Sequence, residues 1–251
     1  MLAVLAFAAC GEKGGENTPG DDPQKEEVGK SVEYVTTGDG KRLMDKVELP
    51  FGCPVQLLSN VVTLDPSTKY QTVDGFGCAV TGSTCYNLLK MSKADRTAFL
   101  KEVFDPEEGM GSSMIRVTIG SSDFGLDEYT WCDMPGIENF AMHALDRRDV
   151  IPVLKEILAI NPDIRIVASP WSAPRWMKRN LYDDGDYYSW TSGRLKKECY
   201  QDYATYFVKW IQTMKAEGID IYAMTIQNEP LNNGNSMSMY MSWTEQRNFI
   251  K

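Results

Sequence analysis

The sequence is poor in residues that hold metal ions. It contains a single histidine, His143, and its six cysteines form no CxxC pair and no cluster with that histidine. Structural zinc sites need Cys or His ligands at short spacings, so we expect no bound metal. His143 has no Ser or Cys partner motif and is predicted to be structural or solvated rather than catalytic.

Basic residues are also few relative to acidic ones. The 26 Lys and Arg against 35 Asp and Glu give a formal net charge of −9 over 251 residues. Binding to phosphates needs an excess of positive charge, so this balance argues against a nucleic-acid partner. Neutral carbohydrate meets no such barrier. The 6 Trp, 12 Tyr and 9 Phe suit sugar stacking, although most aromatic residues pack in a core.

No long hydrophobic run is present. The apolar residues 1–10 are far too few to span a bilayer. Their length and composition predict a signal peptide, and Ala8-Ala9-Cys10 resembles the acylation box of a bacterial lipoprotein. We therefore expect Cys10 to carry lipid and to anchor the protein to the bacterial cell envelope, facing the periplasm or the outer surface. The alternative is a short buried segment.

Composition divides the rest of the chain into three parts. Residues 11–42 are predicted to be a flexible tether, because their first half is rich in Gly, Pro and Glu. Residues 43–66 contain short β-type runs at 54–58 and 61–64, which predict strands of a side β-domain. Residues 67–251 repeat a strand–loop–helix pattern and form the predicted main domain.

The repeated pattern predicts a parallel sheet with helical crossovers. We expect strands at residues 71–74, 114–119, 164–168 and 222–226, and helices from 92, at 147–160, at 198–217 and from 243. Loops after the strands are long and rich in Trp, Asp, Asn and Gly, whereas loops after the helices are short. This asymmetry predicts about the first half of a (β/α)8 TIM barrel with its site at the C-terminal ends of the strands.

The alternative architecture is an open doubly wound α/β sheet. Such sheets bind nucleotides through GxGxxG or GxxxxGK[ST] after a strand, and neither motif occurs here. We therefore favour the barrel and expect no organic cofactor.

Polar or aromatic side chains follow three of the predicted strands. Asp123 follows the second, Trp171 the third, and Asn228 with Glu229 the fourth. Asp123 is predicted either to accept hydrogen bonds from sugar hydroxyls or to cap a turn. Trp171 is predicted either to form a wall against a sugar ring or to pack under the loops.

Glu229 is the candidate general acid. Buried among apolar and amide neighbours, its charged form would be disfavoured, and the pKa would rise toward the working pH. The alternative is a structural glutamate paired with an arginine such as Arg116.

Four stretches together resemble glycoside hydrolase family 30, which includes lysosomal-type glucosylceramidases and microbial β-1,6-glucanases. They are GFGCAVTG (75–82), IRVTIGSSDF (115–124), ASPWSAPRW (168–176) and TIQNEP (225–230). The resemblance covers residues 43–251 and occurs in the family's order. The stretches DFGLDEYTWCD (123–133) and QDYATYFVKW (201–210) are more similar to the β-1,6-glucanase branch.

This resemblance implies a retaining hydrolase of β-glucosidic linkages that needs no metal or cofactor. It assigns the acid/base role to Glu229, a hydrogen bond with the sugar 2-hydroxyl to Asn228, and the lining of the −1 subsite to Asp123 and Trp171. It places the nucleophile beyond Lys251. The expected partner is a β-glucan or glucoside, with membrane contact only through the lipid. The alternative is a catalytically incomplete chain that at most binds carbohydrate.

Overall fold

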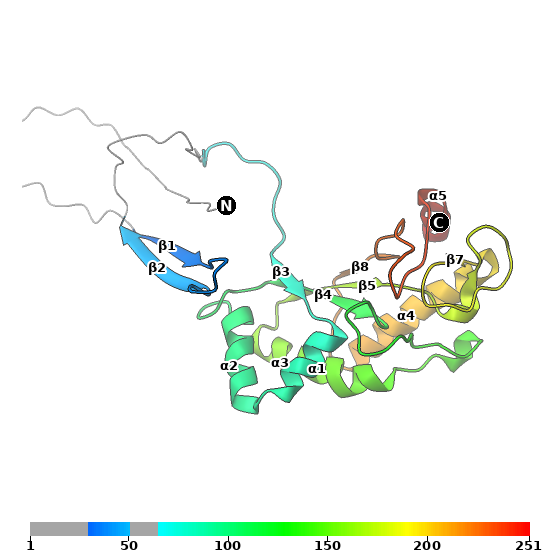
Figure 1. Ribbon diagram of the computed structural model, residues 1–251, viewed down its shortest axis with the longest axis horizontal. Coiled ribbons are helices and arrows are strands. Elements are labelled where there is room, and N and C mark those ends of the chain that lie inside the picture. Colours follow the sequence, from blue (N-terminus) through cyan, green and yellow to red (C-terminus); the bar gives the residue numbers. More distant parts are fainter. Residues whose placement is uncertain (1–29, 51–64) are drawn as a thin grey trace, which may run out of the picture. The chain divides into compact units, whose positions relative to one another are not determined.

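The computed structural model describes residues 30–50 and 65–251, which belong to two separate units (Figure 1). Residues 72 and 73 mark the boundary between the units. Cys10 and the strands expected at 54–58 and 61–64 lie outside the described residues.

Residues 30–50 of the first unit form an antiparallel hairpin. Strand β1 (Lys30–Val35) pairs with β2 (Asp45–Pro50), so that Lys30 lies opposite Pro50 and Val35 opposite Asp45. The predicted tether (11–42) is therefore wrong for its residues 30–35. Polar and apolar residues alternate over residues 31–34 (SVEY), which is the period-two pattern of a strand.

The second unit is built on a parallel four-stranded sheet, as predicted. Its order is β3-β4-β5-β8, and every neighbouring pair is parallel. The strands are β3 (Gly77–Ala79), β4 (Met114–Ile119), β5 (Arg165–Pro170) and β8 (Ala223–Met224). The spatial order follows the chain order, as in successive units of a barrel.

Helices lie along one side of this sheet (Figure 1). They are α1 (Gly82–Lys90), α2 (Lys93–Phe104), α3 (Ile151–Ile160) and α4 (Tyr200–Ala216). A π-helical turn, Asp146–Val150, precedes α3, and a further helix, α5 (Trp243–Ile250), follows β8. None of the described helices combines the length and apolar character needed to cross a bilayer.

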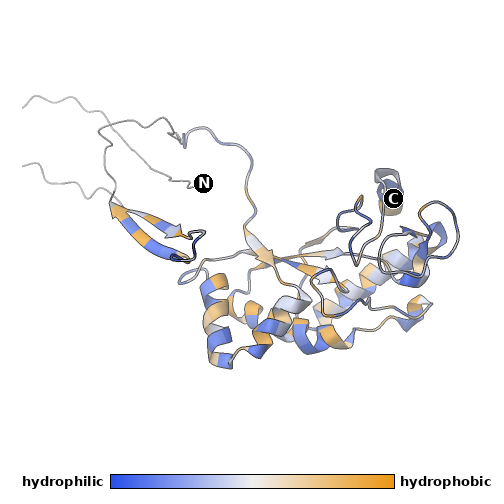
Figure 2. Ribbon diagram, viewed as in Figure 1, coloured by the Kyte–Doolittle hydropathy of each residue, from blue (hydrophilic) through white to orange (hydrophobic). Residues whose placement is uncertain are grey.

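Alternation along the strands decides which face is buried. In β4 the side chains of Ile115, Val117 and Ile119 are buried, whereas those between them are partly exposed. Successive strand residues point to opposite faces, so the buried set packs against the helices and Arg116 belongs to the other face. Figure 2 shows apolar and polar residues interleaved along the helices, as expected for elements buried on one side.

Some element boundaries differ from the predictions. The helix predicted from 92 is confirmed, because α2 follows an N-cap at Ser92, whose hydroxyl accepts a hydrogen bond from the Asp95 amide. Helix α1 was not predicted, and the first strand lies at Gly77–Ala79 rather than at 71–74. Position 77 of β3 requires a glycine, because a Cβ on this residue would collide with the Met114 carbonyl oxygen of β4.

A small hairpin follows β5 and overlies the C-terminal ends of the strands. After the 3-10 turn η3 (Arg175–Met177), strand β6 (Lys178–Arg179) pairs with β7 (Arg194–Leu195). The 14 residues between these strands form a loop rich in Tyr and Asp.

Candidate active site

The structure brings three of the predicted site residues to neighbouring strand ends. The backbone N–H of Asn228 donates to the Pro170 carbonyl at the end of β5, at 2.8 Å. The Asn228 side-chain oxygen accepts a hydrogen bond from Arg116 of β4, at 2.7 Å. The segment after β8 is thus fixed to both β4 and β5, and it carries Glu229 beside Trp171.

Trp171 packs under the loops. Its side chain is 8% exposed and clusters with Trp190 and Met237. The Arg116 guanidinium carbon lies 4.8 Å from the centroid of the Trp171 ring, close enough for a cation–π contact. The Trp171 indole nitrogen is buried and has no acceptor within the described part of the chain.

Gln227 links the two loops that carry Trp171 and Asn228. Its amide nitrogen donates to the Trp171 carbonyl at 2.7 Å and to the Asn228 carbonyl at 3.1 Å. The side chain is buried. The Gln227 side-chain amide therefore fixes the spacing between the C-terminal ends of β5 and β8.

Glu229 is exposed, so the prediction of a buried glutamate is wrong. The reason is the position of β8, which pairs with β5 on one side and with no other described strand. The Glu229 carboxylate accepts a hydrogen bond from Asn232 at 2.8 Å. Its backbone φ of +40° is in the left-handed region, which is uncommon for a residue with a Cβ and often marks a functional position. The alternative pairing with Arg116 does not occur, because Arg116 bonds Asn228.

Asp123 is exposed on the loop after β4. Its carboxylate makes no hydrogen bond or ion pair with the described residues. The predicted turn-capping role belongs to Ser122, whose hydroxyl accepts from the Phe124 amide at 3.1 Å. The Phe124 carbonyl accepts from the Ser83 amide at 3.0 Å, which ties the loop to α1. Asp123 is therefore held at the surface with its oxygen atoms free.

Lys178 is a buried residue that the sequence analysis did not find. Its ammonium donates to the Ser172 hydroxyl at 3.0 Å, and to the carbonyls of Ser189 at 2.8 Å, Trp190 at 3.4 Å and Ser238 at 3.0 Å. Burial lowers the pKa of Lys178 to about 7. Lys followed by Arg is typical of a solvated surface, so no local sequence signal identifies this lysine.

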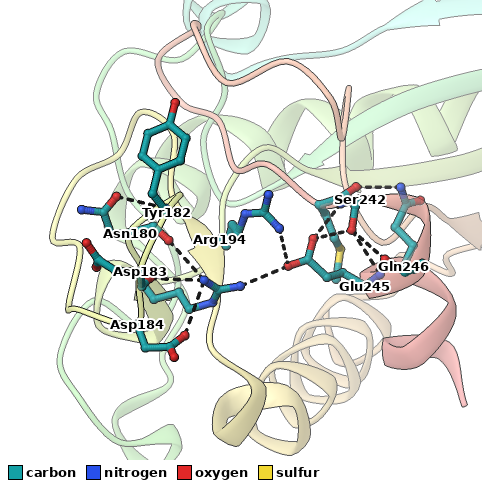
Figure 3. Close-up of polar contacts among 11 residues, drawn as sticks. Asn180, Tyr182, Asp183, Asp184, Arg194, Ser242, Glu245 and Gln246 are labelled. Carbon is teal, nitrogen blue, oxygen red and sulfur yellow. Dashed lines mark hydrogen bonds and ion pairs between the residues drawn. The ribbon is translucent and has the colours of Figure 1, made fainter.

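The hairpin is also tied to α5 by an ion-pair cluster (Figure 3). Glu245 accepts from Arg194 at 3.1 Å and from Arg179 at 3.4 Å. The same carboxylate accepts from the amide and hydroxyl of Ser242, which completes a capping box at the start of α5. Tyr182 projects away from this cluster in Figure 3 and is 92% exposed.

The remaining titratable candidates are structural. His143 stacks on Tyr129 with ring centroids 3.8 Å apart, and burial lowers the pKa of the imidazole. Cys78 and Cys85 are free rather than bridged. Among residues 30–50 and 65–251, no group of three or more His, Cys, Asp or Glu side chains is placed to hold a metal ion.

The sheet, the helices on one side of it and the polar strand ends agree with a known family. Residues 73–251 match the family model described as the glycosyl hydrolase family 30 TIM-barrel domain. The chain belongs to glycosyl hydrolase family 30. The predicted family and the partial (β/α) barrel are confirmed, and the open doubly wound alternative is excluded.

Other members of family 30 are similar over much of this chain. The endo-1,6-beta-D-glucanase of Neurospora crassa is 33% identical over 87% of the chain and 47% of its own length. The lysosomal acid glucosylceramidase of Mus musculus is 33% identical over 68% of the chain and 33% of its own length. The chain spans less than half the length of these curated relatives.

A solved structure of an endo-beta1,6-glucanase superimposes with a TM-score of 0.77. It is 55% identical, covering 87% of this chain and 47% of the solved one. SrfJ from Salmonella typhimurium superimposes with a TM-score of 0.70 at 26% identity, covering 82% of this chain and 45% of its own.

Proposed function

We propose that this chain forms the substrate-binding and acid/base part of a retaining hydrolase that cleaves β-1,6-glucan. The observation that carries the proposal is the joined strand-end group, in which Asn228 and Glu229 lie beside Trp171 and Arg116. The preference for β-1,6-glucan over glucosylceramide is supported by the 55% identity to the solved endo-beta1,6-glucanase.

Glu229 would donate a proton to the leaving glycosidic oxygen and later remove one from water. Its exposure at a strand end leaves it open to a ligand from solvent. Binding of a sugar over the carboxylate would exclude water, which raises the pKa of a carboxyl group toward the value that suits an acid. Retaining hydrolysis also needs a second carboxyl group about 5 Å away, acting as the nucleophile.

Asn228 is oriented for contact with a sugar hydroxyl. Because its oxygen accepts from Arg116, its amide NH2 group faces away from that bond and has no acceptor among the described residues. A free amide donor beside the acid is what a hydrogen bond to the 2-hydroxyl requires, and such a bond strengthens in the transition state. Asp123 would accept from further hydroxyls.

The test is the substitution Glu229→Gln in the protein that contains this chain. Loss of the acid should lower cleavage of β-1,6-linked glucose oligomers by about 10²- to 10⁴-fold. Aryl glucosides with good leaving groups need no proton and should form the glycosyl-enzyme at a nearly unchanged rate. Equal losses on both kinds of substrate would contradict the acid role.

A second candidate function is carbohydrate binding without hydrolysis. The observation that favours it is the set of unused polar groups at the strand ends, since the exposed Asp123 carboxylate and the Asn228 amide donor can hold a sugar without performing chemistry. Saturable binding of a β-glucan with no release of reducing sugar would support this second function over the first.

We further propose that Cys10 attaches the protein to the bacterial cell envelope through a lipid. The sequence Ala8-Ala9-Cys10 supports this anchor. Replacement of Cys10 by Ala should move the protein from the membrane fraction to the soluble fraction. An unchanged distribution would contradict the anchor.

A further inference from the structure

Arg175 is a half-buried arginine whose donors are unused. It lies in η3, four residues after Trp171, and its side chain makes no hydrogen bond or ion pair with any described residue. Its Nε atom is buried and has no acceptor. The guanidinium carbon lies between two aromatic rings, 4.8 Å from the Tyr188 centroid and 4.6 Å from the Trp190 centroid.

Five other arginines of this unit have carboxylate partners, namely Arg96, Arg148, Arg165, Arg179 and Arg194. Arg96 donates to Glu156 at 2.8 Å, and Arg165 donates to Asp74 at 2.9 Å. A guanidinium that loses water without gaining an acceptor costs free energy. The two rings cover its faces but cannot accept its in-plane N–H groups, so a ligand rich in acceptor oxygen atoms would satisfy it.

The acidic loop beside Arg175 does not supply that acceptor. Asp184 pairs with Arg179 at 3.6 Å, and Asp186 pairs with Lys196. Lys178 lies close enough to oppose Arg175 electrostatically, and its own contacts are to uncharged oxygens. The guanidinium thus remains the unpaired cation between Tyr188 and Trp190.

A continuous row of contacts joins Arg175 to the candidate active site. Trp190 packs with Trp171, which contacts Arg116, which bonds Asn228. At the outer end of the row, Tyr188 is 57% exposed and presents its ring to solvent. The order of the row is Asn228, Arg116, Trp171, Trp190, Arg175 and Tyr188.

We propose that Arg175 and Tyr188 form an outer sugar-binding site, supported by Trp190. It holds a glucosyl unit of the same β-glucan chain, of which another unit lies at Asn228. Sugar hydroxyls supply the acceptors that Arg175 lacks, and the exposed Tyr188 ring supplies an apolar face for the sugar C–H groups. This inference rests on the proposed function, from which it takes the ligand class.

The experiment measures Kd by calorimetry for a series of β-1,6-linked glucose oligomers of two to five units. Wild-type protein should bind the longer oligomers more tightly than the shortest. Arg175→Met should remove this gain, weakening the longest oligomer by about tenfold, and should leave the shortest unchanged. The matched control is Arg247→Met, which removes an exposed arginine stacked 5.4 Å from the Trp243 centroid on α5.

Three outcomes separate the inference from the proposed function. If wild-type protein binds none of the oligomers, the proposed function fails and the outer site falls with it. If Arg175→Met keeps the length-dependent gain, the outer site alone is contradicted. If Arg175→Met lowers the melting temperature, Tyr188→Ala tests the outer site instead, because it removes a half-exposed ring. Retention of the gain in a folded Tyr188→Ala protein overturns the inference.

Discussion

Arg116 determines which way the Asn228 amide faces. A side-chain amide has a donor end and an acceptor end, and the 2.7 Å bond from Arg116 occupies the acceptor end. The donor end is then available to a ligand. Arg116 also covers the Trp171 ring, so one guanidinium fixes two of the side chains assigned to sugar binding.

Asp146 is a second residue whose environment differs strongly from water. Its carboxylate is buried and accepts hydrogen bonds from the Tyr129 hydroxyl and the Trp131 indole. Burial raises the pKa of Asp146 to about 6, against the opposing effect of these two donors, and the charge of Asp149 raises it further. The native state therefore binds a proton more tightly here than the unfolded chain does.

This pKa shift predicts a pH dependence of stability. Between the unfolded pKa near 4 and the folded pKa of about 6, the native state holds more protons at Asp146, so its contribution falls as pH rises. The difference in unfolding free energy between wild type and Asp146→Asn should fall by about 3 kcal/mol from pH 4 to 7. Urea unfolding at several pH values measures it.

The control for this prediction is Gln201→Asn, which changes an exposed side chain that does not titrate. A difference in unfolding free energy between wild type and Asp146→Asn that stays constant or grows with pH would contradict the direction of the Asp146 pKa shift.

At the scale of elements, Lys178 joins three loops of the C-terminal face. Its acceptors lie after β5 (Ser172), in the hairpin loop (Ser189) and after β8 (Ser238). These segments share no strand pairing with one another. Backbone hydrogen bonds from Ser238 to Trp190 and from Tyr240 to Gly193 join the hairpin loop to the segment after β8. The buried ammonium adds the segment after β5 to this group.

Lys178→Met should destabilise the fold, because buried oxygens lose their donor. Each unsatisfied buried oxygen costs about 1–3 kcal/mol, which lowers the melting temperature by several degrees in a unit of this size. Lys215→Met is the control, since the Lys215 side chain is 74% exposed. Calorimetry that finds equal melting temperatures for the two variants would contradict the role of Lys178.

The junction of the hairpin with α5 depends on Glu245. Glu245→Ala removes the capping box and leaves Arg179 and Arg194 without this partner. We expect a loss of roughly 1–3 kcal/mol of unfolding free energy. The exposed Glu198 makes no hydrogen bond to a described residue, and Glu198→Ala should change stability by less than about 0.5 kcal/mol. Similar losses of unfolding free energy in both variants, measured by urea unfolding, would contradict the stabilising role of Glu245 at this junction.

Local signals in the sequence predicted the elements better than the contacts between them. The helix predicted from 92 coincides with α2, and the strand predicted at 114–119 coincides with β4, because both depend on neighbours in the chain. The exposure of the Glu229 side chain could not be predicted this way, since it depends on which elements flank β8. The bond between Arg116 and Asn228 and the buried position of Lys178 likewise join residues far apart in sequence.

At the scale of the whole molecule, the main sheet ends in two strands with exposed apolar neighbours. Phe76 precedes β3 and is 77% exposed, and Tyr222 precedes β8 and is 55% exposed. Each of these edge strands pairs on one side only within the described residues. Unpaired strand edges with exposed apolar side chains favour association between chains.

We therefore expect the 251-residue chain to self-associate as its concentration rises. Light scattering during gel filtration should show a mass that increases with loading. The double substitution Phe76→Lys and Tyr222→Lys places charges at both edges and should reduce the association. A constant monomer mass for the unmodified chain at all concentrations would contradict this expectation.

The most direct test of the central claim is the release of reducing sugar from β-1,6-glucan. Wild-type protein containing this chain should release sugar from β-1,6-glucan, far less from β-1,3-glucan, and Glu229→Gln should nearly abolish the release. Release that is unaffected by Glu229→Gln, or cleavage of glucosylceramide with none of β-1,6-glucan, would contradict the account.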